Sequence, residues 1–354
     1  MHASDQTRSA GGRHAVVTGG AGFIGSHLTE HLLARGDTVW VIDNLSTGRD
    51  ANLDDARAAA GDRLRVINAD VARGLEQIPP GAPIAEVYHL AAAVGVDLVL
   101  REPIESIEVN IGRTLDVLRF AQARGNLPTL IASSSEVYGK PGTTVFSEDD
   151  DVVYGPTTVT RWSYAATKAI DEYLALAFCN QRDLPAVVVR FFNTVGPRQV
   201  GDYGMVLPRF VRSALAGEPL RVFGDGQQTR CFCDVRDVRD ALPKLLARPE
   251  CAGRVFNLGS DLETTIADLA ETVVTTLESP SSIDRVPYAD AYPAGFEDLR
   301  HRRPDLRRVR EAIGFEPRVT LDQTVRDIAR TIRAERPGAS PSPSGASGAT
   351  GGNA

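Results

Sequence analysis

The stretch from His14 to Asp43 constrains the fold of this chain more than any other part of its sequence. It has the pattern of a short apolar strand, a glycine-rich turn, a helix and a second apolar strand that ends in a carboxylate. Gly19, Gly22 and Gly25 follow the first strand three residues apart. Glycines in such a turn allow a tight bend, a close backbone approach to a pyrophosphate and close packing of the helix on the strand. The stretch therefore predicts the first βαβ unit of a dinucleotide-binding sheet.

Asp43, at the end of the second predicted strand, indicates which dinucleotide binds. Its carboxylate is placed to accept hydrogen bonds from the adenosine ribose hydroxyls, and it repels a 2′-phosphate. The preceding helix offers its N-terminal amides and the positive end of its dipole to the phosphates. We therefore expect NAD, rather than NADP, as the cofactor.

The first half of the chain alternates short apolar strands with helical patterns. Beyond the first unit, strands are predicted at 64–70, 86–94, 129–135 and 185–193, and helices at 51–61, 102–124 and 162–180. Short apolar strands that alternate with helices are typical of a parallel sheet covered on both faces. The fold class is therefore α/β, with a Rossmann-like doubly wound parallel sheet and the cofactor across the carboxyl ends of its strands.

The composition changes after Asn193, where Gly, Pro and Arg become frequent. We predict a flexible leader at 1–13, a Rossmann domain at 14–192, a smaller C-terminal α+β substrate lobe at 193–335 and a disordered tail at 336–354. The tail is predicted from its Pro, Gly, Ser and Ala content. In the lobe, helices are expected at 207–216, 266–277 and 321–335, and a strand pair at 220–223 and 230–235.

Charge and cysteine content exclude several partners. The formal net charge is −7 and the basic residues are scattered, which argues against nucleic acid and anionic membranes. No apolar run approaches the roughly 20 residues of a membrane span, and the leader lacks a secretory signal. Cys231 and Cys233 are expected on one face of a strand, without the further His or Cys of a metal site. We therefore expect no metal, and buried thiols in a cytoplasmic protein.

Tyr164 and Lys168 form a Tyr-x-x-x-Lys pair on a predicted helix, where both side chains project from one face. An ammonium beside a phenol lowers the pKa of the phenol, which makes Tyr164 a usable base for a hydroxyl proton while hydride leaves to NAD. Ser134 ends a predicted strand, placed to orient the same hydroxyl, and Glu136 is near enough for acid–base work at a neighbouring carbon. The structural alternative is that Ser134 and Ser135 cap a turn and that Glu136 is solvated.

Together these residues resemble the extended short-chain dehydrogenase/reductase superfamily, and within it the nucleotide-sugar epimerases, dehydratases and decarboxylases. The resemblance covers residues 14–333, on the motifs TGGAGFIG, Asp43, Asp70-Val71, HLAAA, SSSEVYG, YAATK and RFFNTVGPRQ. It implies tightly bound NAD that is reduced and re-oxidised within one catalytic cycle. It also implies a homodimer formed by the helices at 102–124 and 162–180.

The resemblance and the motif positions also assign the site residues. The residues expected to bind the cofactor are Gly19, Gly22, Phe23, Ile24, Gly25, Asp43, Asn44, Asp70, Val71, Leu90, Ala91, Ala92, Asn110, Tyr164 and Lys168. The lobe is expected to bind a nucleotide sugar such as a UDP-sugar. Asn193 and Arg230 are assigned to its diphosphate, Arg302 to the sugar-phosphate side, and Val222 and Phe223 to the base.

All subfamilies oxidise the sugar at C4, and the motifs favour different reactions after that oxidation. Glu136 resembles dehydratases and decarboxylases, and RWSYAATK, CFCDVRD and GFEDLRHRRPD are similar to the glucuronate decarboxylase domain of the aminoarabinose pathway. The Ala91–Leu100 loop lacks the Pro-rich, Tyr-bearing segment of xylose-forming decarboxylases, and Val99 occupies the Tyr position. Ser135 replaces the Asp of deoxythymidine-diphosphoglucose dehydratases, although a Ser-Glu pair fits guanosine-diphosphomannose dehydratases.

Because the Ala91–Leu100 loop looks most like those of bacterial epimerase homologues, the preferred prediction is a UDP-sugar 4-epimerase. The first alternative is a UDP-glucuronate decarboxylase that forms UDP-xylose or a 4-keto-pentose, in which Glu136 and Arg302 form the acid–base pair. A 4,6-dehydratase is third. A dehydrogenase that releases NADH stays open, and a non-catalytic NAD sensor is disfavoured because Ser134, Tyr164 and Lys168 occur together.

Overall fold

The computed structural model describes residues 12–93, 101–200, 205–287 and 300–335. Its main sheet has seven parallel strands in the order β12-β7-β5-β4-β1-β2-β3. These strands are β1 (His14–Thr18), β2 (Thr38–Asp43), β3 (Leu64–Asn68), β4 (Ile84–His89), β5 (Thr129–Ser134), β7 (Ala186–Phe191) and β12 (Val255–Leu258). From β1 the chain winds first to one edge and then, through β4, to the other. The predicted doubly wound Rossmann-like sheet is confirmed.

Helices cover both faces of this sheet because its strands are apolar on both sides. They are α1 (Phe23–Ala34), α2 (Asp54–Ala60), α3 (Val71–Glu76), α5 (Pro103–Ala123), α6 (Arg161–Arg182), α8 (Val235–Leu246) and α11 (Arg307–Ile313), with short 3₁₀ turns η1 (Asp50–Leu53), η2 (Gly61–Arg63), η3 (Ser135–Tyr138) and η5 (Pro249–Cys251). In β1, Ala15 and Val17 belong to the apolar cluster on one face and Val16 to the cluster on the other. Because alternate residues of a strand point to opposite faces of the sheet, one strand contributes side chains to two separate cores.

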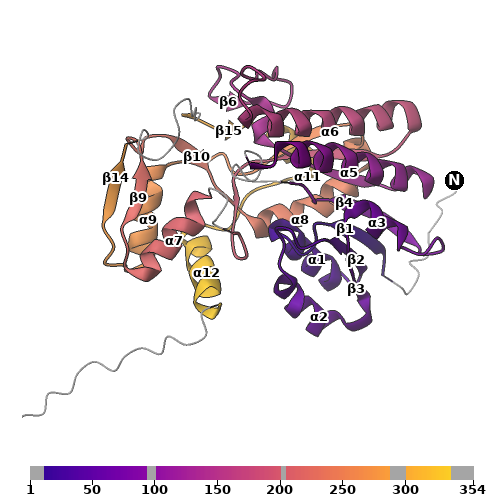
Figure 1. Cartoon of the computed structure of the whole chain (residues 1–354), viewed down its shortest axis with the longest axis horizontal. Helices are drawn as coiled ribbons and strands as arrows, with labels where there is room; N and C mark the ends of the chain where they lie inside the picture. Colours follow the sequence, from indigo (N-terminus) through magenta and orange to yellow (C-terminus); the bar gives the residue numbers. More distant parts are fainter. Residues whose placement is uncertain (1–11, 94–100, 201–204, 288–299, 336–354) are drawn as a thin grey trace, which may run out of the picture.

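A smaller lobe lies at the left of Figure 1, beside the sheet and its helices. Its helices α7 (Val206–Ala216), α9 (Ile266–Leu277) and α12 (Leu321–Ala334) share an apolar core. β9 (Leu220–Phe223) pairs in parallel with β14 (Ile283–Val286), and β10 (Thr229–Cys231) pairs antiparallel with β13 (Glu263–Thr265). Two further pairs join β6 (Val145–Phe146) to β15 (Arg303–Pro304) and β8 (Thr194–Val195) to β11 (Cys233–Asp234).

The predicted strand pair at 220–223 and 230–235 is wrong. The first segment pairs with residues 283–286, and the second divides into β10 and β11, which join different partners. Cys231 and Cys233 therefore lie in two strands, each buried, and among the described residues no group of His, Cys, Asp or Glu could hold a metal ion. The alternation of apolar and polar residues indicates where short strands lie, but it does not determine which distant segment each strand pairs with.

The chain also crosses the predicted boundary at residue 193 more than once. α8, β12 and α11 follow that boundary, yet β12 is the seventh strand of the main sheet and both helices contribute to the core of one of its faces. The sequence pattern did not predict α8 or β12. The two parts are therefore interleaved, and the substrate lobe is built from segments that leave the sheet and return to it.

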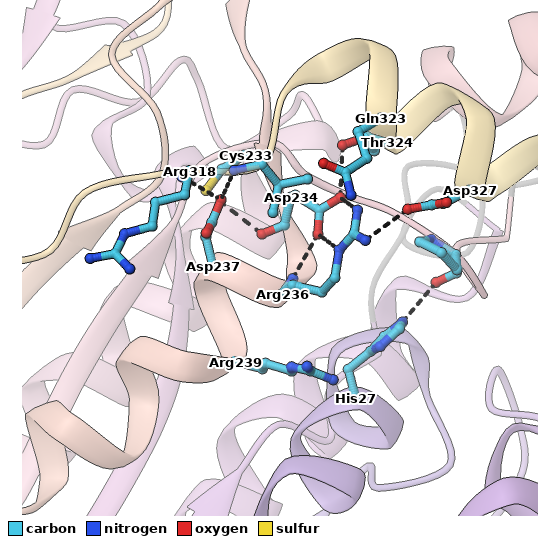
Figure 2. Close-up of polar contacts among 12 residues, drawn as sticks. His27, Cys233, Asp234, Arg236, Asp237, Arg239, Arg318, Gln323, Thr324 and Asp327 are labelled. Atoms are coloured by element: carbon cyan, nitrogen blue, oxygen red, sulfur yellow. Dashed lines mark hydrogen bonds and ion pairs between the residues drawn. The ribbon is translucent and has the colours of Figure 1, made fainter.

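Figure 2 shows how the lobe is attached at the start of α8. The Asp234 carboxylate caps α8 by accepting from the Arg236 backbone N–H at 2.8 Å, and it accepts from the Thr324 hydroxyl of α12 at 2.7 Å. Arg236 forms ion pairs with Asp234 and, at 2.7 Å, with Asp327 of α12. Asp237 accepts from the backbone N–H of Arg318 just before α12. Buried charge at one helix terminus thus holds the last helix of the lobe on the sheet domain.

None of the described helices is both long enough and apolar enough to cross a membrane. The predicted leader, apart from residues 12 and 13, and the predicted tail lie outside the described residues.

Candidate active site

The turn between β1 and α1 has the form that a dinucleotide requires. Gly19 has φ +71°, and a Cβ on Gly25 would lie 2.0 Å from the Gly19 carbonyl oxygen. A Cβ on Gly19 would lie 2.7 Å from the Ala91 nitrogen. α1 begins after Gly22, with no side-chain cap on its first amides and no acidic residue in its first turn. The first turn of α1 therefore supplies no acidic side chain of its own, and the residues of this turn fit a bound diphosphate.

Asp43 lies at the carboxyl end of β2, beside this turn. One carboxylate oxygen accepts from Ala21 N at 2.9 Å and the other from Leu45 N at 2.8 Å. These bonds hold a side chain that is only 8 % exposed at the position predicted for the ribose hydroxyls. The neighbouring Asn44 is exposed.

Asp70 and Asn110, both predicted to bind the cofactor, form hydrogen bonds and ion pairs within the protein. Asp70 caps α3 through Ala72 N at 3.0 Å and pairs with Arg113 at 2.9 Å. Asn110, buried in α5, accepts from Ala93 N at 2.8 Å and donates to the Thr167 hydroxyl of α6 at 3.2 Å. Asn110 thus ties the segment after β4 to the helix that carries Tyr164 and Lys168. Residues 94–100, and with them Val99 and most of the loop used to compare reactions, lie outside the described residues.

The predicted catalytic residues come together at the carboxyl ends of β5 and the start of α6. Ser134 ends β5, and its hydroxyl accepts from Glu136 N at 3.2 Å and hydrogen-bonds the Tyr164 phenol. The structural interpretation of Ser134 is therefore confirmed, since it caps η3, and its contact with the tyrosine leaves its role toward a substrate hydroxyl a prediction. Lys168 is 2 % exposed on the same helix.

The prediction that Lys168 lowers the pKa of Tyr164 is wrong for the chain as described. Burial raises the pKa of the phenol, the negative charges of Glu136 and Asp171 raise it further, and the hydrogen bond from Ser134 only partly offsets them. The Lys168 ammonium instead donates to the Asp171 carboxylate at 2.7 Å. The motif spacing does not show the net pKa, because its largest cause is burial.

Glu136 lies among three arginines from distant parts of the chain. It pairs with Arg302 and, at 3.9 Å, with Arg161 of α6, and Arg230 of β10 also acts on its charge. Burial by itself raises the pKa of Glu136, but the three guanidinium groups outweigh it and the net pKa is below the usual value. The Glu136 side chain keeps partial contact with solvent, at 29 % exposed, but its carboxylate is paired with arginines rather than free in solvent.

The lobe residues predicted at the substrate have different surroundings. Asn193 donates to the Cys231 carbonyl at 3.5 Å, which places it beside the strand that carries Arg230. Phe223 is half-buried, with the Arg209 guanidinium 4.7 Å above its ring. Val222 is 1 % exposed within the core of the lobe. Its side chain therefore packs the lobe, which leaves Phe223 as the one of this pair that can pack a base.

Three residues of the site were missed from the sequence. Arg161 precedes Tyr164 by three residues on α6 and so shares its face, a spacing signal that was present. Asp171 follows Lys168 by three residues, with the same signal. His89 ends β4, is 1 % exposed, and lies between the hydroxyls of Thr18 and Thr114 at 2.8 and 3.2 Å. Burial lowers its pKa to about 3, helped by the charge of Lys168.

Comparison with known proteins agrees with this geometry. The family described as "NAD dependent epimerase/dehydratase family" matches residues 15–259. The chain belongs to this family. It is thus an NAD-dependent nucleotide-sugar enzyme of the epimerase, dehydratase and decarboxylase group, and the prediction of NAD as cofactor is confirmed at the level of the family.

Two curated relatives are uronate decarboxylases. UDP-N-acetyl-alpha-D-glucosaminuronate decarboxylase of Bacillus cytotoxicus is 38 % identical over 324 residues, which cover 91 % of this chain and 98 % of the relative. UDP-glucuronic acid decarboxylase 2 of Arabidopsis thaliana is 35 % identical over 322 residues, which cover 88 % of this chain and 66 % of the relative. These relatives favour the decarboxylase alternative over the preferred prediction of a 4-epimerase.

Solved structures include 4-epimerases. UDP-N-acetylglucosamine 4-epimerase of Methanobrevibacter ruminantium M1, in complex with UDP-N-acetylmuramic acid, has a TM-score of 0.81 at 28 % identity and covers 92 % of this chain and 100 % of that chain. Because decarboxylases and epimerases both resemble this chain, its fold does not distinguish the two reactions.

Proposed function

We propose that this chain is an NAD-dependent decarboxylase of a UDP-linked uronic acid. The observation that carries the proposal is the placement of Glu136 with Arg302 and Arg161, next to Tyr164. Guanidinium groups bind carboxylates and phosphates through paired hydrogen bonds, so this setting suits a sugar that carries a carboxylate beside its reacting carbon. The names of the two curated relatives support the same substrate class.

In the proposed reaction the residues at the end of β5 act on the sugar C4 hydroxyl. NAD, when bound, accepts the hydride from C4. Tyr164 takes the hydroxyl proton, and Ser134 orients that hydroxyl through its bond to the phenol. The resulting C4 ketone lies two carbons from the C6 carboxylate, so the electrons left at C5 when carbon dioxide departs are delocalised onto the ketone oxygen. Arg302 and Glu136 form the acid–base pair that returns a proton to C5.

The substrate classes that support the proposal are those of the relatives, UDP-glucuronate and UDP-N-acetylglucosaminuronate. Purified enzyme with each sugar, labelled with carbon-13 at C6, is followed by proton and carbon NMR. The expected result is labelled carbon dioxide together with a pentose or 4-keto-pentose anomeric signal. A new anomeric signal with the label retained in the sugar contradicts decarboxylation and restores C4 epimerisation.

Tyr164→Phe tests whether the chain is an enzyme or only binds NAD. Without the phenol the C4 hydroxyl has no base, and general-base catalysis typically contributes about 10²- to 10⁴-fold. We expect turnover to fall by about that factor while NAD binding, measured by calorimetry, stays within about twofold. Unchanged turnover would remove Tyr164 from the mechanism.

Glu136→Gln separates the two halves of the reaction. The amide keeps the shape of the side chain but cannot complete the acid–base pair with Arg302. The oxidation and the first loss of carbon dioxide then proceed and the cycle stalls, so that NADH absorbance accumulates on the enzyme and steady-state carbon dioxide release falls. A full rate of carbon dioxide release from this variant would exclude Glu136 from the second half.

A further inference from the structure

We propose that Asp171 is a positioning residue for the catalytic pair, because its buried carboxylate engages the Lys168 ammonium one turn after Lys168, on the same face of α6 as Tyr164. Nothing in the relatives' names or in the motif spacing assigns a role to this residue. The inference rests on the proposed role of Tyr164 as the base.

The contacts place Lys168 between two residues of its own helix. Tyr164 lies four residues before it, and Asp171 three residues after it, so the flexible lysine side chain can extend toward one or the other along the helix. It extends toward Asp171, with 2.7 Å between Nζ and Oδ2. The side chains of Lys168 and Asp171 are 3 % and 0 % exposed. Because both charges are withdrawn from water, the ion pair is only weakly screened.

The described groups around this pair come from α5, β4, β7, η3 and α6 itself. Burial raises the pKa of the Asp171 carboxyl, and the Lys168 ammonium and Thr114 of α5 only partly offset this. Thr114 also contacts His89 of β4, which burial keeps neutral near pH 7. Glu172, the next residue of α6, is engaged at 2.7 Å by Arg190 of β7. On the phenol side, Glu136 of η3 is the other charge that acts on Tyr164. Asp171 is therefore the carboxylate that engages the Lys168 ammonium.

The consequence concerns the acidity of the base. An ammonium beside a phenol lowers its pKa, and a carboxylate that draws the ammonium away removes that effect and adds its own opposite one. Burial is the largest cause of the raised pKa of Tyr164, and Asp171 adds to it. Asp171 therefore adds to the free-energy cost of ionising Tyr164, beyond the cost that burial and Glu136 already impose.

Asp171→Asn tests the ion pair directly, in protein that needs no substrate. The chain has three lysines, Lys140, Lys168 and Lys244, so the ammonium region of a nitrogen-15 lysine-labelled spectrum is readily assigned with Lys140→Arg and Lys244→Arg. We expect the Lys168 signal to shift and its protons to exchange faster with water in Asp171→Asn. The exposed Asp151→Asn, the same chemical change elsewhere, is expected to leave that signal unchanged. A Lys168 signal unaffected by Asp171→Asn overturns the proposal.

The pKa of Tyr164 is measured separately, by following tyrosinate absorbance as the pH is raised. The contribution of Tyr164 is the part of this absorbance that is absent from the matching Tyr164→Phe protein. Asp171→Asn should lower the pH at which Tyr164 ionises by about one pH unit. Asp171→Glu, which keeps the charge, should return it toward the parent value. If Asp171→Asn does not fold, Asp171→Ser removes the charge with a smaller polar side chain and carries the same expectation. If Tyr164 ionises at the same pH in the folded Asp171→Asn or Asp171→Ser protein as in the parent, the ion pair is only structural and the proposal is overturned.

Turnover distinguishes this inference from the proposed function. With an active sugar, the acidic limb of the pH–rate profile should move to lower pH in Asp171→Asn, again by about one pH unit. If the lysine signal and the tyrosinate titration change as expected but neither uronic acid is converted, the role of Asp171 stands and the proposed substrate is wrong. An acidic limb that does not move in an active variant overturns the positioning role.

Discussion

Tyr164 and Lys168 show that the spacing of two residues predicts their presence in a site but not their electrostatic state. Their positions on one helix face were predictable, and so was the nearby Ser134. The net pKa of Tyr164 depends on burial, on Glu136 from η3 and on Asp171, none of which belongs to the motif. Once Tyr164 is withdrawn from water, its pKa depends on burial and on charges outside the motif, such as Asp171 on the same helix and Glu136 on another element.

Buried histidines make a testable contribution to acid stability. His27 of α1 donates from Nε2 to the Pro197 carbonyl at 3.0 Å, and burial lowers its pKa from 6.5 to about 4. Between these pH values the unfolded chain binds a proton that the folded chain does not, so the free energy of unfolding falls as the pH falls through this window. The total loss from His27 is about 3 kcal/mol.

His27→Gln keeps a donor for the Pro197 carbonyl but does not titrate. We expect its stability in urea unfolding to depend less steeply on pH between about 6.5 and about 4. The exposed His301→Gln is the matched control and should keep the parent slope. Equal slopes in His27→Gln and the parent would show that His27 is not the group responsible.

At the scale of elements, the β1–α1 unit was predictable because each step is local. The strand, the turn and the helix follow one another without a break, and the atoms nearest to an added Cβ on Gly19 or Gly25 belong to their own turn or to the adjacent segment after β4. The strands of the lobe were not predictable in the same way. β9 pairs with β14 across more than fifty residues of chain. A pairing of only four residues cannot be recognised from the local sequence of either strand.

Gly25→Ala tests the close approach in the cofactor turn. The new Cβ would lie 2.0 Å from the Gly19 carbonyl oxygen, so the turn must open. We expect a destabilisation of about 1–3 kcal/mol by chemical unfolding and weaker NAD binding by calorimetry. Gly81→Ala, where the added Cβ meets open space, should leave both unchanged. Parent-like NAD affinity in Gly25→Ala would mean that the diphosphate does not bind at this turn.

Asp234→Asn tests the attachment of α12 to α8 (Figure 2). The buried Asp234 carboxylate is shared by the cap of α8, Arg236 and Thr324, and removing its charge leaves Arg236 with Asp327 alone. We expect a loss of about 3 kcal/mol of stability, because breaking a buried pair leaves one charge uncompensated. The exposed Asp62→Asn should stay within about 0.5 kcal/mol of the parent. Hydrogen exchange that is unchanged in α12 would contradict the role of this contact.

At the scale of the whole molecule, the proposed homodimer uses the outer face of α5 and α6, two helices that pack against each other. This face exposes Ile104 and Tyr173 at 73 % and 69 %, with Ile107 and Ile170 also exposed. Apolar side chains gathered on one face of a folded protein indicate an interaction surface. We propose that a second copy of the chain covers it.

A variant with Ile104→Lys and Tyr173→Lys tests this interface. Four lysines facing one another across a two-fold axis repel and cannot bury, so the variant is expected to sediment as a monomer while the parent sediments as a dimer. Leu262→Lys, at a residue 74 % exposed on the lobe, is the control and should remain dimeric. A parent protein that sediments as a monomer at all concentrations would contradict the interface.

The sequence by itself determined the βαβ start, the parallel sheet, the glycine-rich turn and the candidate residues Ser134, Tyr164 and Lys168, because these depend on local periodicity and on residues close together in the chain. Only the tertiary structure decided that β12 completes the sheet, that Val222 is buried in the lobe, and that Glu136 meets Arg302. The same holds for the acidity of Tyr164. These features depend on contacts between distant segments and on burial. The spacing of neighbouring residues encodes neither the contacts nor the burial.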